Sequence, residues 1–489
     1  MNRQIRIIAL IFLALFGAVF INLNWVQLVN AGKLANNRAN IRVTLRAYAT
    51  ERGPILTADN AEVAVSSPTP NDQYKWLRTY PLGPSYAQVT GYFSLVYGNS
   101  ELESTENDKL TGSGGKLTMQ SLSDQLLGNK TVGDTVVLNI NNKLQQVATQ
   151  ALGAKKGAVV ALDPNTGAIL AMVSSPSYDP TLLSSHDTTS IENTWKVLQG
   201  NADKPMLNRA TNQAYPPGST FKVITAVAAL QNGLGTNTTY APVNQFLPAQ
   251  TSNPIKNFGG ETCGGDMTAA FTVSCNAYFA KLGDALPAGA LASTAKAFGF
   301  DSNPPLEIPA DASRIASDAD LSSPAFTAQS AIGQYNDAAT PLQMALVAAA
   351  VANKGTIMTP RLVKEVLDHQ GNVIDQPKPA PWKTNVMSQQ TAATMTQMME
   401  NVVNSPQGTG TAAKIPNVTV AGKTGTAQNA TGAAPHAWFI AFAPAEAPQI
   451  AVAVLVENGG NLGSDATGGL VSAPIAKTII QTDQQIAGW

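Results

Sequence analysis

Charge, cysteine and histidine are all scarce in this sequence. Only 13% of the 489 residues are charged, the formal net charge is −1, and no stripe rich in lysine or arginine is present. Nucleic-acid binding is therefore not expected, because it depends on a basic surface. Two cysteines and three histidines are too few and too scattered for a zinc site. We expect neither a metal ion nor a cofactor, and the length allows two or three domains.

A long apolar run lies close to the N-terminus. Arg3 and Arg6 precede an uninterrupted apolar run over residues 7–21. The stretch 7–29 is just long enough to span a bilayer, which needs about 20 residues. A cleaved signal peptide is the alternative, but the nearest small-residue site, "VNAG", lies well beyond the apolar run. We therefore predict a single-pass cell-membrane anchor, with residues 1–6 in the cytoplasm and the rest of the chain outside.

Beyond the anchor, the sequence divides into a smaller module over residues 30–150 and a larger one over residues 155–489. In the smaller module, "ERGPILTADNAEVAVS" predicts strand, turn and strand, and "DTVVLNINNKLQQVATQAL" predicts a strand followed by an amphipathic helix. Between them, "YGNSELESTENDKLTGSGGK" is rich in turn formers, so we expect it at the surface. The smaller module is thus expected to mix strands and helices.

The larger module begins and ends with strands. Two apolar runs flank "DPNTG" near its start, which predicts a hairpin. Near its end, "AGKTGTAQ", "HAWFIAFAP" and "QIAVAVLVEN" predict three successive strands, and "APIAKTIIQTDQQIAGW" predicts a closing helix. Alanine-rich helices lie in between. We predict an α/β (α+β) fold in which one antiparallel sheet joins both ends of the module and helices pack on it.

The stretch "YPPGSTFKVITAVAAL" places a serine and a lysine at the start of an apolar helix. Ser219 and Lys222 are three positions apart, so their side chains share one face of the helix, one turn apart. A serine nucleophile needs a base, and His186, His369 and His436 have no surroundings typical of a catalytic triad. A lysine can be that base if burial or a second cation lowers its pKa. An apolar helix start meets this requirement.

The Ser-x-x-Lys pattern alone is not specific, because it occurs three times in the chain. Ser113 begins "SGGK" in a glycine-rich polar loop, and Ser293 begins "STAK" on what resembles an ordinary helix face with a solvated lysine. Two further motifs distinguish Ser219: "SCN" at 274–276 is the only Ser-x-Asn, and "KTG" at 423–425 is the only Lys-Ser/Thr-Gly. Taken alone, the "SCN" motif is explained as well by a helix cap, and the lysine of "KTG" by a solvated position at the end of a strand. In this order, together, they indicate one site.

The ordered trio of Ser-x-x-Lys, Ser-x-Asn and Lys-Thr-Gly is typical of penicillin-binding proteins and class A β-lactamases. The chain most resembles class B penicillin-binding proteins, in particular their actinobacterial A type. "NRATNQAYPPGSTFKVITAVAAL", "GAVVALDPNTGAILAMVSSPSYDP", "TPLQMALVAAAVANKG" and "AWFIAFAP" resemble segments of the catalytic half, and "RGPILTADN" and "YGNSELE" resemble the membrane-proximal half. The resemblance covers nearly the whole chain. It implies a penicillin-binding, serine β-lactamase-like transpeptidase domain after a pedestal or dimerisation module.

The resemblance also implies the catalytic roles. Ser219 attacks the carbonyl of a D-Ala-D-Ala peptide bond, and Lys222 accepts its proton. Ser274 relays that proton towards the leaving D-alanine amine. Asn276 orients Lys222 and the substrate backbone. Which of Lys222 and Ser274 carries each proton stays open at this point.

Four further positions are expected to bind the substrate. The charge of Lys423 and the hydroxyl of Thr424 suit the terminal carboxylate of the peptide or of a β-lactam. Gly425 suits a place where substrate approaches the strand closely. By resemblance, the backbone N–H groups of Ser219 and Thr426 form the oxyanion hole.

The favoured function is a membrane-anchored D,D-transpeptidase that cross-links peptidoglycan stem peptides, is acylated by β-lactams and serves cell division and septal wall synthesis. A D,D-carboxypeptidase is one alternative, and a non-enzymatic β-lactam sensor or division scaffold is another. A serine β-lactamase would need a loop that positions a deacylating water, and no such loop is apparent. No glycosyltransferase signature precedes the larger module. Division proteins and a separate glycosyltransferase are therefore the expected partners.

Two positions depart from the usual family pattern or add to it. Tyr335 stands where many relatives carry glycine, which leaves the contour of that loop open. Cys275 occupies the variable middle position of "SCN", 12 positions after Cys263. Since Ser274 and Asn276 should face the cleft, the Cys275 side chain should point away, towards the glycine-rich loop of Cys263. Outside the cytoplasm disulfides persist, so a bridge between the two cysteines can form. Two separate buried thiols are the alternative arrangement, and the sequence leaves both open.

Overall fold

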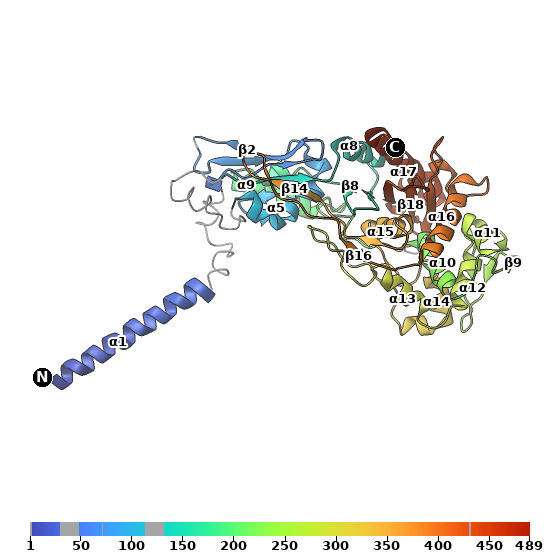
Figure 1. Cartoon of the computed structure of the whole chain (residues 1–489), viewed down its shortest axis with the longest axis horizontal. Helices are drawn as coiled ribbons and strands as arrows, with labels where there is room; N and C mark the ends of the chain where they lie inside the picture. Colours follow the sequence, from blue (N-terminus) through green and yellow to red (C-terminus); the bar gives the residue numbers. More distant parts are fainter. Residues whose placement is uncertain (1, 30–47, 71, 113–131, 430–431) are drawn as a thin grey trace.

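The computed structural model describes residues 2–29, 48–70, 72–112, 132–429 and 432–489. The helix α1 (Asn2–Asn24) and the π-helical turn η1 (Trp25–Val29) cover the predicted anchor. Among the described residues, one helix is long and apolar enough to cross a membrane, over Arg3–Gln27, with a mean hydropathy of 2.4. Its side chains are exposed, and Figure 1 shows it lying apart from the two sheets.

The larger sheet has five strands in the order β17-β18-β19-β7-β8, and every neighbouring pair is antiparallel. The hairpin around "DPNTG" and the three strands near the C-terminal end are therefore confirmed. All residues of the three inner strands, β18, β19 and β7, are buried, because helices cover both faces of the sheet. The strands are β7 (Gly157–Leu162), β8 (Ile169–Ser175), β17 (Ala421–Ala427), β18 (His436–Ala443) and β19 (Ile450–Val456).

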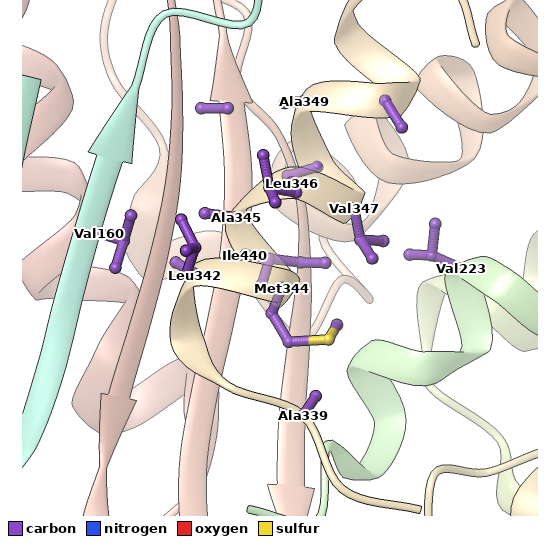
Figure 2. Packing of buried hydrophobic residues seen from close by; sticks show 14 of the residues in the cluster. Val160, Val223, Ala339, Leu342, Met344, Ala345, Leu346, Val347, Ala349 and Ile440 are labelled. Carbon is purple, nitrogen blue, oxygen red and sulfur yellow. The ribbon is translucent and has the colours of Figure 1, made fainter. Parts of the chain in front are cut away.

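One face of this sheet is covered by α15 (Pro341–Ala352), a helix that is buried along its whole length. Thr340 begins it, since its hydroxyl accepts a hydrogen bond from the Gln343 N–H at 3.1 Å. Figure 2 shows that α15 lies between the sheet, at Ile440, and α10 (Lys222–Gln231), at Val223. A helix without a polar face requires partners on every side. In this position α15 fixes the distance between the sheet and α10, the helix that carries Lys222.

The opposite face of the sheet is covered by two helices from distant parts of the chain. The predicted C-terminal helix is α17 (Gly468–Ala487), and it packs beside α8 (Asn142–Leu152). Leu144, Ala148 and Leu152 of α8 are fully buried in this layer. The predicted amphipathic helix is therefore confirmed, but it packs on the five-stranded sheet.

The smaller sheet has six strands in the order β15-β14-β6-β1-β2-β3. The predicted strand, turn and strand after residue 50 are β1 and β2, which pair antiparallel, and β6 pairs parallel with β1. Ile55, Val63 and Val136 from three of these strands are buried in one apolar layer, whereas all residues of β15 are exposed. The strands are β1 (Ile55–Leu56), β2 (Glu62–Pro68), β3 (Trp76–Thr79), β6 (Thr135–Leu138), β14 (Val363–Leu367) and β15 (Val373–Asp375).

The division of the chain at residues 150–155 needs a correction. β14 and β15 come from the middle of the larger module, yet β14 pairs with β6 and completes the smaller sheet. Short-range patterns cannot reveal this pairing, because more than 200 residues separate the two strands. Asn139 holds the crossing point, since its side-chain amide donates to the carbonyls of Arg361 and Val363 at 3.1 and 3.2 Å. The two modules are therefore interleaved rather than consecutive.

The expectation that "YGNSELESTENDKL" lies at the surface is confirmed only in part, since Ser104, Thr105 and Asp108 are exposed but other residues of the stretch are buried. It forms α5 (Glu101–Thr105) and α6 (Asn107–Leu110), and the side chain of Glu103 is fully buried. The carboxylate of Glu103 pairs with the guanidinium groups of Arg52 and Arg78 at 2.5 and 2.7 Å. Burial alone would raise the pKa of Glu103, but the two arginines outweigh it and lower that pKa. The remainder of the predicted surface stretch, from residue 113, lies outside the described residues.

Candidate active site

The nucleophile candidate sits on a tight turn rather than within a regular helix. η4 (Gly218–Phe221) is one 3-10 turn that leads directly into α10, and Ser219 is half-buried on it. Gly218 has φ of 53°, a left-handed conformation that favours glycine. Its N–H donates to the Gly333 carbonyl at 2.9 Å, and the indole N–H of Trp438 donates to the Pro216 carbonyl at 2.9 Å. The turn is therefore held from two sides.

Lys222 begins α10, and its side chain is fully buried. Its Nζ donates to the Ser274 carbonyl at 2.6 Å, to the Ser274 Oγ at 3.3 Å and to the Asn276 Oδ1 at 2.7 Å. Within the described part of the chain, these bonds tie Lys222 to the "SCN" motif rather than to Ser219. Burial, and then the nearby ammonium of Lys423, lower the pKa of Lys222 well below its ordinary value. A lysine in this state can act as a base near neutral pH.

The "SCN" motif forms the turn between α11 (Met267–Thr272) and α12 (Asn276–Asp284). Ser274 has φ of 59°, a conformation that non-glycine residues rarely adopt. Its Oγ accepts hydrogen bonds from Lys423 at 2.8 Å and from Lys222 at 3.3 Å. One hydroxyl is therefore shared by two ammonium groups. The strained backbone of Ser274 can persist because the surrounding structure fixes it.

The "KTG" motif lies on β17, at the edge of the larger sheet. Lys423 is fully buried, and burial lowers its pKa to about 7. Its Nζ also donates to the Thr424 carbonyl at 3.0 Å. The Thr424 hydroxyl bonds to the hydroxyl of Thr409 at 2.6 Å. Thr409 was not predicted from the sequence, and no motif marks it, because only the fold brings it to β17.

The space around Gly425 is filled by the protein itself. A Cβ at this position would lie 2.9 Å from Cγ2 of Thr220 and 2.9 Å from Cβ of Trp438. The absence of a Cβ at Gly425 therefore lets β17 pack against the turn that carries Ser219, and the approach of substrate to this strand stays a prediction. The carbonyl of Thr426 lies 2.9 Å from where a Cβ of Gly218 would be. The strand thus brings Thr426 beside the turn that carries Ser219.

The two cysteines are joined by a disulfide. Cys275 is 1% exposed and is bonded to Cys263 on β12 (Cys263–Gly265), a short strand that pairs with β9 (Tyr240–Val243). Of the two arrangements left open by the sequence, the structure has the bridge. It ties the "SCN" turn to the two-stranded sheet of β12 and β9.

The loop that contains Tyr335 has a physical reason to carry glycine in relatives. Tyr335 has φ of 66°, in the left-handed region. Its hydroxyl donates to Asp320 Oδ1 at 3.0 Å, and its ring stacks on Phe326 with the centroids 4.3 Å apart. These two contacts hold a tyrosine in a conformation that glycine adopts freely.

The Ser293–Lys296 pair does not join the site. Ser293 lies on α13 (Ala290–Ala297) and donates to its own helix at the Ala290 carbonyl, and Lys296 pairs with Asp318 near the surface. Ser113 lies outside the described residues. The described residues also contain no group of three or more histidine, cysteine, aspartate or glutamate side chains that could hold a metal ion.

These residues together suit acyl transfer through a serine. A half-buried Ser219, a buried lysine one turn later with a lowered pKa, and a serine hydroxyl held by two lysines are groups of the kind that can act as nucleophile, base and proton relay. The buried ammonium of Lys423 adds a positive charge where a carboxylate could bind. Helices and an antiparallel sheet that present such a site define the class of penicillin-recognising serine acyltransferases.

Comparison with known families and structures agrees with this class. The family model "Penicillin binding protein transpeptidase domain" matches residues 157–481, and "Penicillin binding protein A dimerisation domain" matches residues 52–136. The chain is 41% identical over 494 residues to "Peptidoglycan D,D-transpeptidase PbpA" of Mycolicibacterium smegmatis, covering 98% of each chain. It is 41% identical over 508 residues to the protein of the same name from Mycobacterium tuberculosis, covering 99% of each.

Solved structures give the same result. Penicillin-binding protein A from M. tuberculosis, as a ceftriaxone acyl-enzyme complex, superposes with a TM-score of 0.85 and 39% identity, covering 89% of this chain and 99% of that one. The penicillin G acyl-enzyme complex of the same protein superposes with a TM-score of 0.83 and 38% identity, covering 89% of this chain and 100% of that one. The chain belongs to the penicillin-binding protein transpeptidase family.

Proposed function

We propose that this chain is a membrane-anchored peptidoglycan D,D-transpeptidase that forms an acyl-enzyme at Ser219 and is acylated there by β-lactams. The observation that carries the proposal is the Ser274 hydroxyl, which two buried lysines hold beside the helix that follows Ser219. Two neighbouring buried cations destabilise a fold, and groups perturbed in this way cluster at functional sites. The names of the relatives, and the β-lactam acyl-enzymes of the solved structures, support the same activity.

Acylation follows from the positions of the three polar groups. Ser219 Oγ attacks the carbonyl carbon of the penultimate D-alanine while neutral Lys222 takes the hydroxyl proton. The N–H groups of Ser219 and Thr426 stabilise the oxyanion, and losing one such donor costs other enzymes about 3–4 kcal/mol. The C–N bond then breaks. The leaving D-alanine amine receives the proton through Ser274, which Lys222 and Lys423 both contact.

Deacylation reverses these steps with a different amine. The amine of a neighbouring stem peptide attacks the ester carbonyl and forms the new amide bond. Its proton passes through Ser274 and Lys222 back to Ser219 Oγ, which restores the free enzyme. Asn276 keeps Lys222 in place throughout, since its Oδ1 accepts from the ammonium at 2.7 Å.

The terminal carboxylate of the peptide is expected at Lys423 and Thr424. Both lie on β17, at the edge strand of the sheet. A carboxylate near the buried Lys423 would stabilise its ammonium form, so binding is expected to raise the pKa of Lys423 above about 7. The same carboxylate is present in β-lactams, which explains how one site takes both ligands.

Two alternatives remain distinct from this proposal. A D,D-carboxypeptidase would acylate in the same way but pass the acyl group to water, and a non-enzymatic sensor would retain it. The curated relatives, whose alignments cover 98–99% of this chain, are named as transpeptidases. Transpeptidation is therefore the preferred outcome.

The location and partners belong to the same proposal. Residues 7–29 are proposed to span the membrane, with residues 1–6 in the cytoplasm and the two modules outside. The apolar helix over Arg3–Gln27, with its exposed side chains, supports an anchor. We place the activity in septal wall synthesis, with division proteins and a separate glycosyltransferase as partners.

Covalent labelling with a fluorescent penicillin tests the activity. The purified protein should be labelled at Ser219, shown by peptide mapping, and Ser219→Ala should abolish the label. Ser293→Ala is the matched control, because it alters a Ser-x-x-Lys serine on another helix, and it should label normally. Undiminished labelling of Ser219→Ala would end the proposal. A D-amino acid acceptor added to the peptide reaction should be incorporated into product, whereas a carboxypeptidase would yield the hydrolysed peptide alone.

A further inference from the structure

The "SCN" turn is held by two neighbouring residues that belong to none of the three motifs. Lys256 ends β11 (Ile255–Lys256), which forms a small hairpin with β10 (Gln245–Phe246), and Asn257 follows it. Both residues touch the first turn of α12, about 20 positions further along the chain. The hairpin segment therefore contacts the start of the helix that carries Asn276.

The side chain of Asn257 is 6% exposed, and every polar group on it is bonded. Its Nδ2 donates to the carbonyls of Val243 and Glu261, both at 2.8 Å. Its Oδ1 accepts from the Ala277 N–H at 2.8 Å. This pattern fixes the orientation of the amide, because a flip would oppose N–H to N–H and oxygen to oxygen.

Asn257 caps α12 from a distant segment. The residue at the N-cap position, Cys275, cannot do so with its side chain, because its sulfur is bonded to Cys263. The first N–H groups of a helix need an acceptor, and Asn257 supplies one to Ala277. The start of α12 is thus fixed by a residue that also ties down two loop carbonyls.

The neighbouring residue fixes the amide of Asn276. The Lys256 carbonyl accepts from Asn276 Nδ2 at 3.0 Å, so that Asn276 Oδ1 faces the Lys222 ammonium at 2.7 Å. A continuous path of hydrogen bonds therefore runs from the hairpin to the base. The strained φ of 59° at Ser274 lies within the same turn and depends on the same supports.

We propose that Asn257 is a positioning residue for acylation, which holds the "SCN" turn so that Asn276 and Ser274 stay on Lys222. The proposal rests on the proposed function, since it concerns how fast Ser219 is acylated. The disulfide acts on Cys275 and Asn257 acts on Ala277, so the two supports are separate.

The test measures the second-order rate constant of acylation by a fluorescent penicillin from pH 5 to 9. Asn257→Ala should slow acylation by roughly 10- to 100-fold, the range that a small misplacement of catalytic groups produces. It should also move the lower pH limb towards lower pH. Lys222 would lose the Asn276 oxygen that stabilises its ammonium, while the ammonium of Lys423 still faces it.

Two variants separate positioning from a general loss of stability. Asn257→Asp keeps an oxygen for the Ala277 N–H but sets its second oxygen against the carbonyls of Val243 and Glu261. Its acylation rate per folded molecule should therefore lie between those of Asn257→Ala and the natural protein, with a pH limb no lower than that of the natural protein. Asn141→Ala is the matched control, because Asn141 Oδ1 caps α8 at the Leu144 N–H, on the far face of the sheet. It should lower the melting temperature without changing the pH limb.

Each outcome is decisive. If Asn257→Ala is less stable but acylates at the natural rate with the natural pH limb, the positioning role is overturned. If Asn257→Ala does not fold, the pH limb and rate of Asn257→Asp decide in the same way. If the natural protein itself is not acylated at Ser219, the proposed function fails instead, so the two failures are distinguishable.

Discussion

Removal of Lys423 should shift the pH at which Ser219 becomes reactive. The Nζ atoms of Lys222 and Lys423 both reach Ser274 Oγ, at 3.3 and 2.8 Å, so they are at most about 6 Å apart, the sum of these distances. At an effective dielectric constant of about 20, two like charges at about 6 Å repel by about 2.8 kcal/mol, or about 2 pKa units. Lys423 therefore lowers the pKa of Lys222 by destabilising its ammonium, in addition to the larger effect of burial.

The sign of the shift follows from the proposed role of Lys222 as a base. Lys423→Met removes the neighbouring charge, raises the pKa of Lys222 and should move the lower limb of the acylation profile up by as much as about 2 pH units. The pKa of Lys423 is about 7, so its charge acts mainly below that pH. The midpoint of the limb is the correct measurement, because the variant also loses a carboxylate-binding group and is slower at every pH.

The assay is the acylation rate of a fluorescent penicillin between pH 5 and 10. Lys296→Met is the matched control, since Lys296 belongs to another Ser-x-x-Lys pair and contacts Asp318 near the surface. Its midpoint should equal that of the natural protein. A Lys423→Met midpoint that stays in place or moves to lower pH would refute Lys222 as the base whose charge Lys423 controls.

Three further outcomes are expected. The Cys263–Cys275 bridge stabilises the fold by roughly 3 kcal/mol against the unfolded state. Its reduction should slow acylation more than the lost stability explains. Alkylation of both thiols without prior reduction would contradict the bridge. Glu103→Gln leaves two buried arginines without their charge partner and should cost about 3–5 kcal/mol in urea unfolding; an unchanged midpoint would contradict this. N-terminal sequencing of membrane-fraction protein should find the anchor retained, and a start near residue 30 would exclude it.

The sequence predicted the parts of the molecule whose signals are local. Hairpin turns, apolar strand runs and the spacing between Ser219 and Lys222 depend on residues a few positions apart, and each of these elements is present. The three motifs were found because their residue types are rare in combination. Their assembly around Ser274 could be expected from the resemblance, but not its left-handed φ.

The sequence could not predict features that depend on distant contacts. Asn257 and Thr409 carry no motif, because their roles come from bonds to Ala277 and Thr424 that only the fold creates. Glu103 was misjudged because a polar, turn-rich stretch normally lies in water. Here its charge is balanced inside the module by arginines that are 25 and 51 positions away. Local composition contains no information about such pairing.

The interleaved sheets impose an order on folding during synthesis. β6 ends at Leu138 and its partner β14 begins at Val363, a separation of 225 residues. At about 5–20 residues per second, ribosomes need roughly 11–45 seconds to cover that interval. During this time the backbone of β6 presents an open strand edge, which is the kind of surface that pairs with other chains. The N-terminal module of a nascent molecule is therefore exposed to mispairing until β14 of the larger module has been made, although this module emerges first.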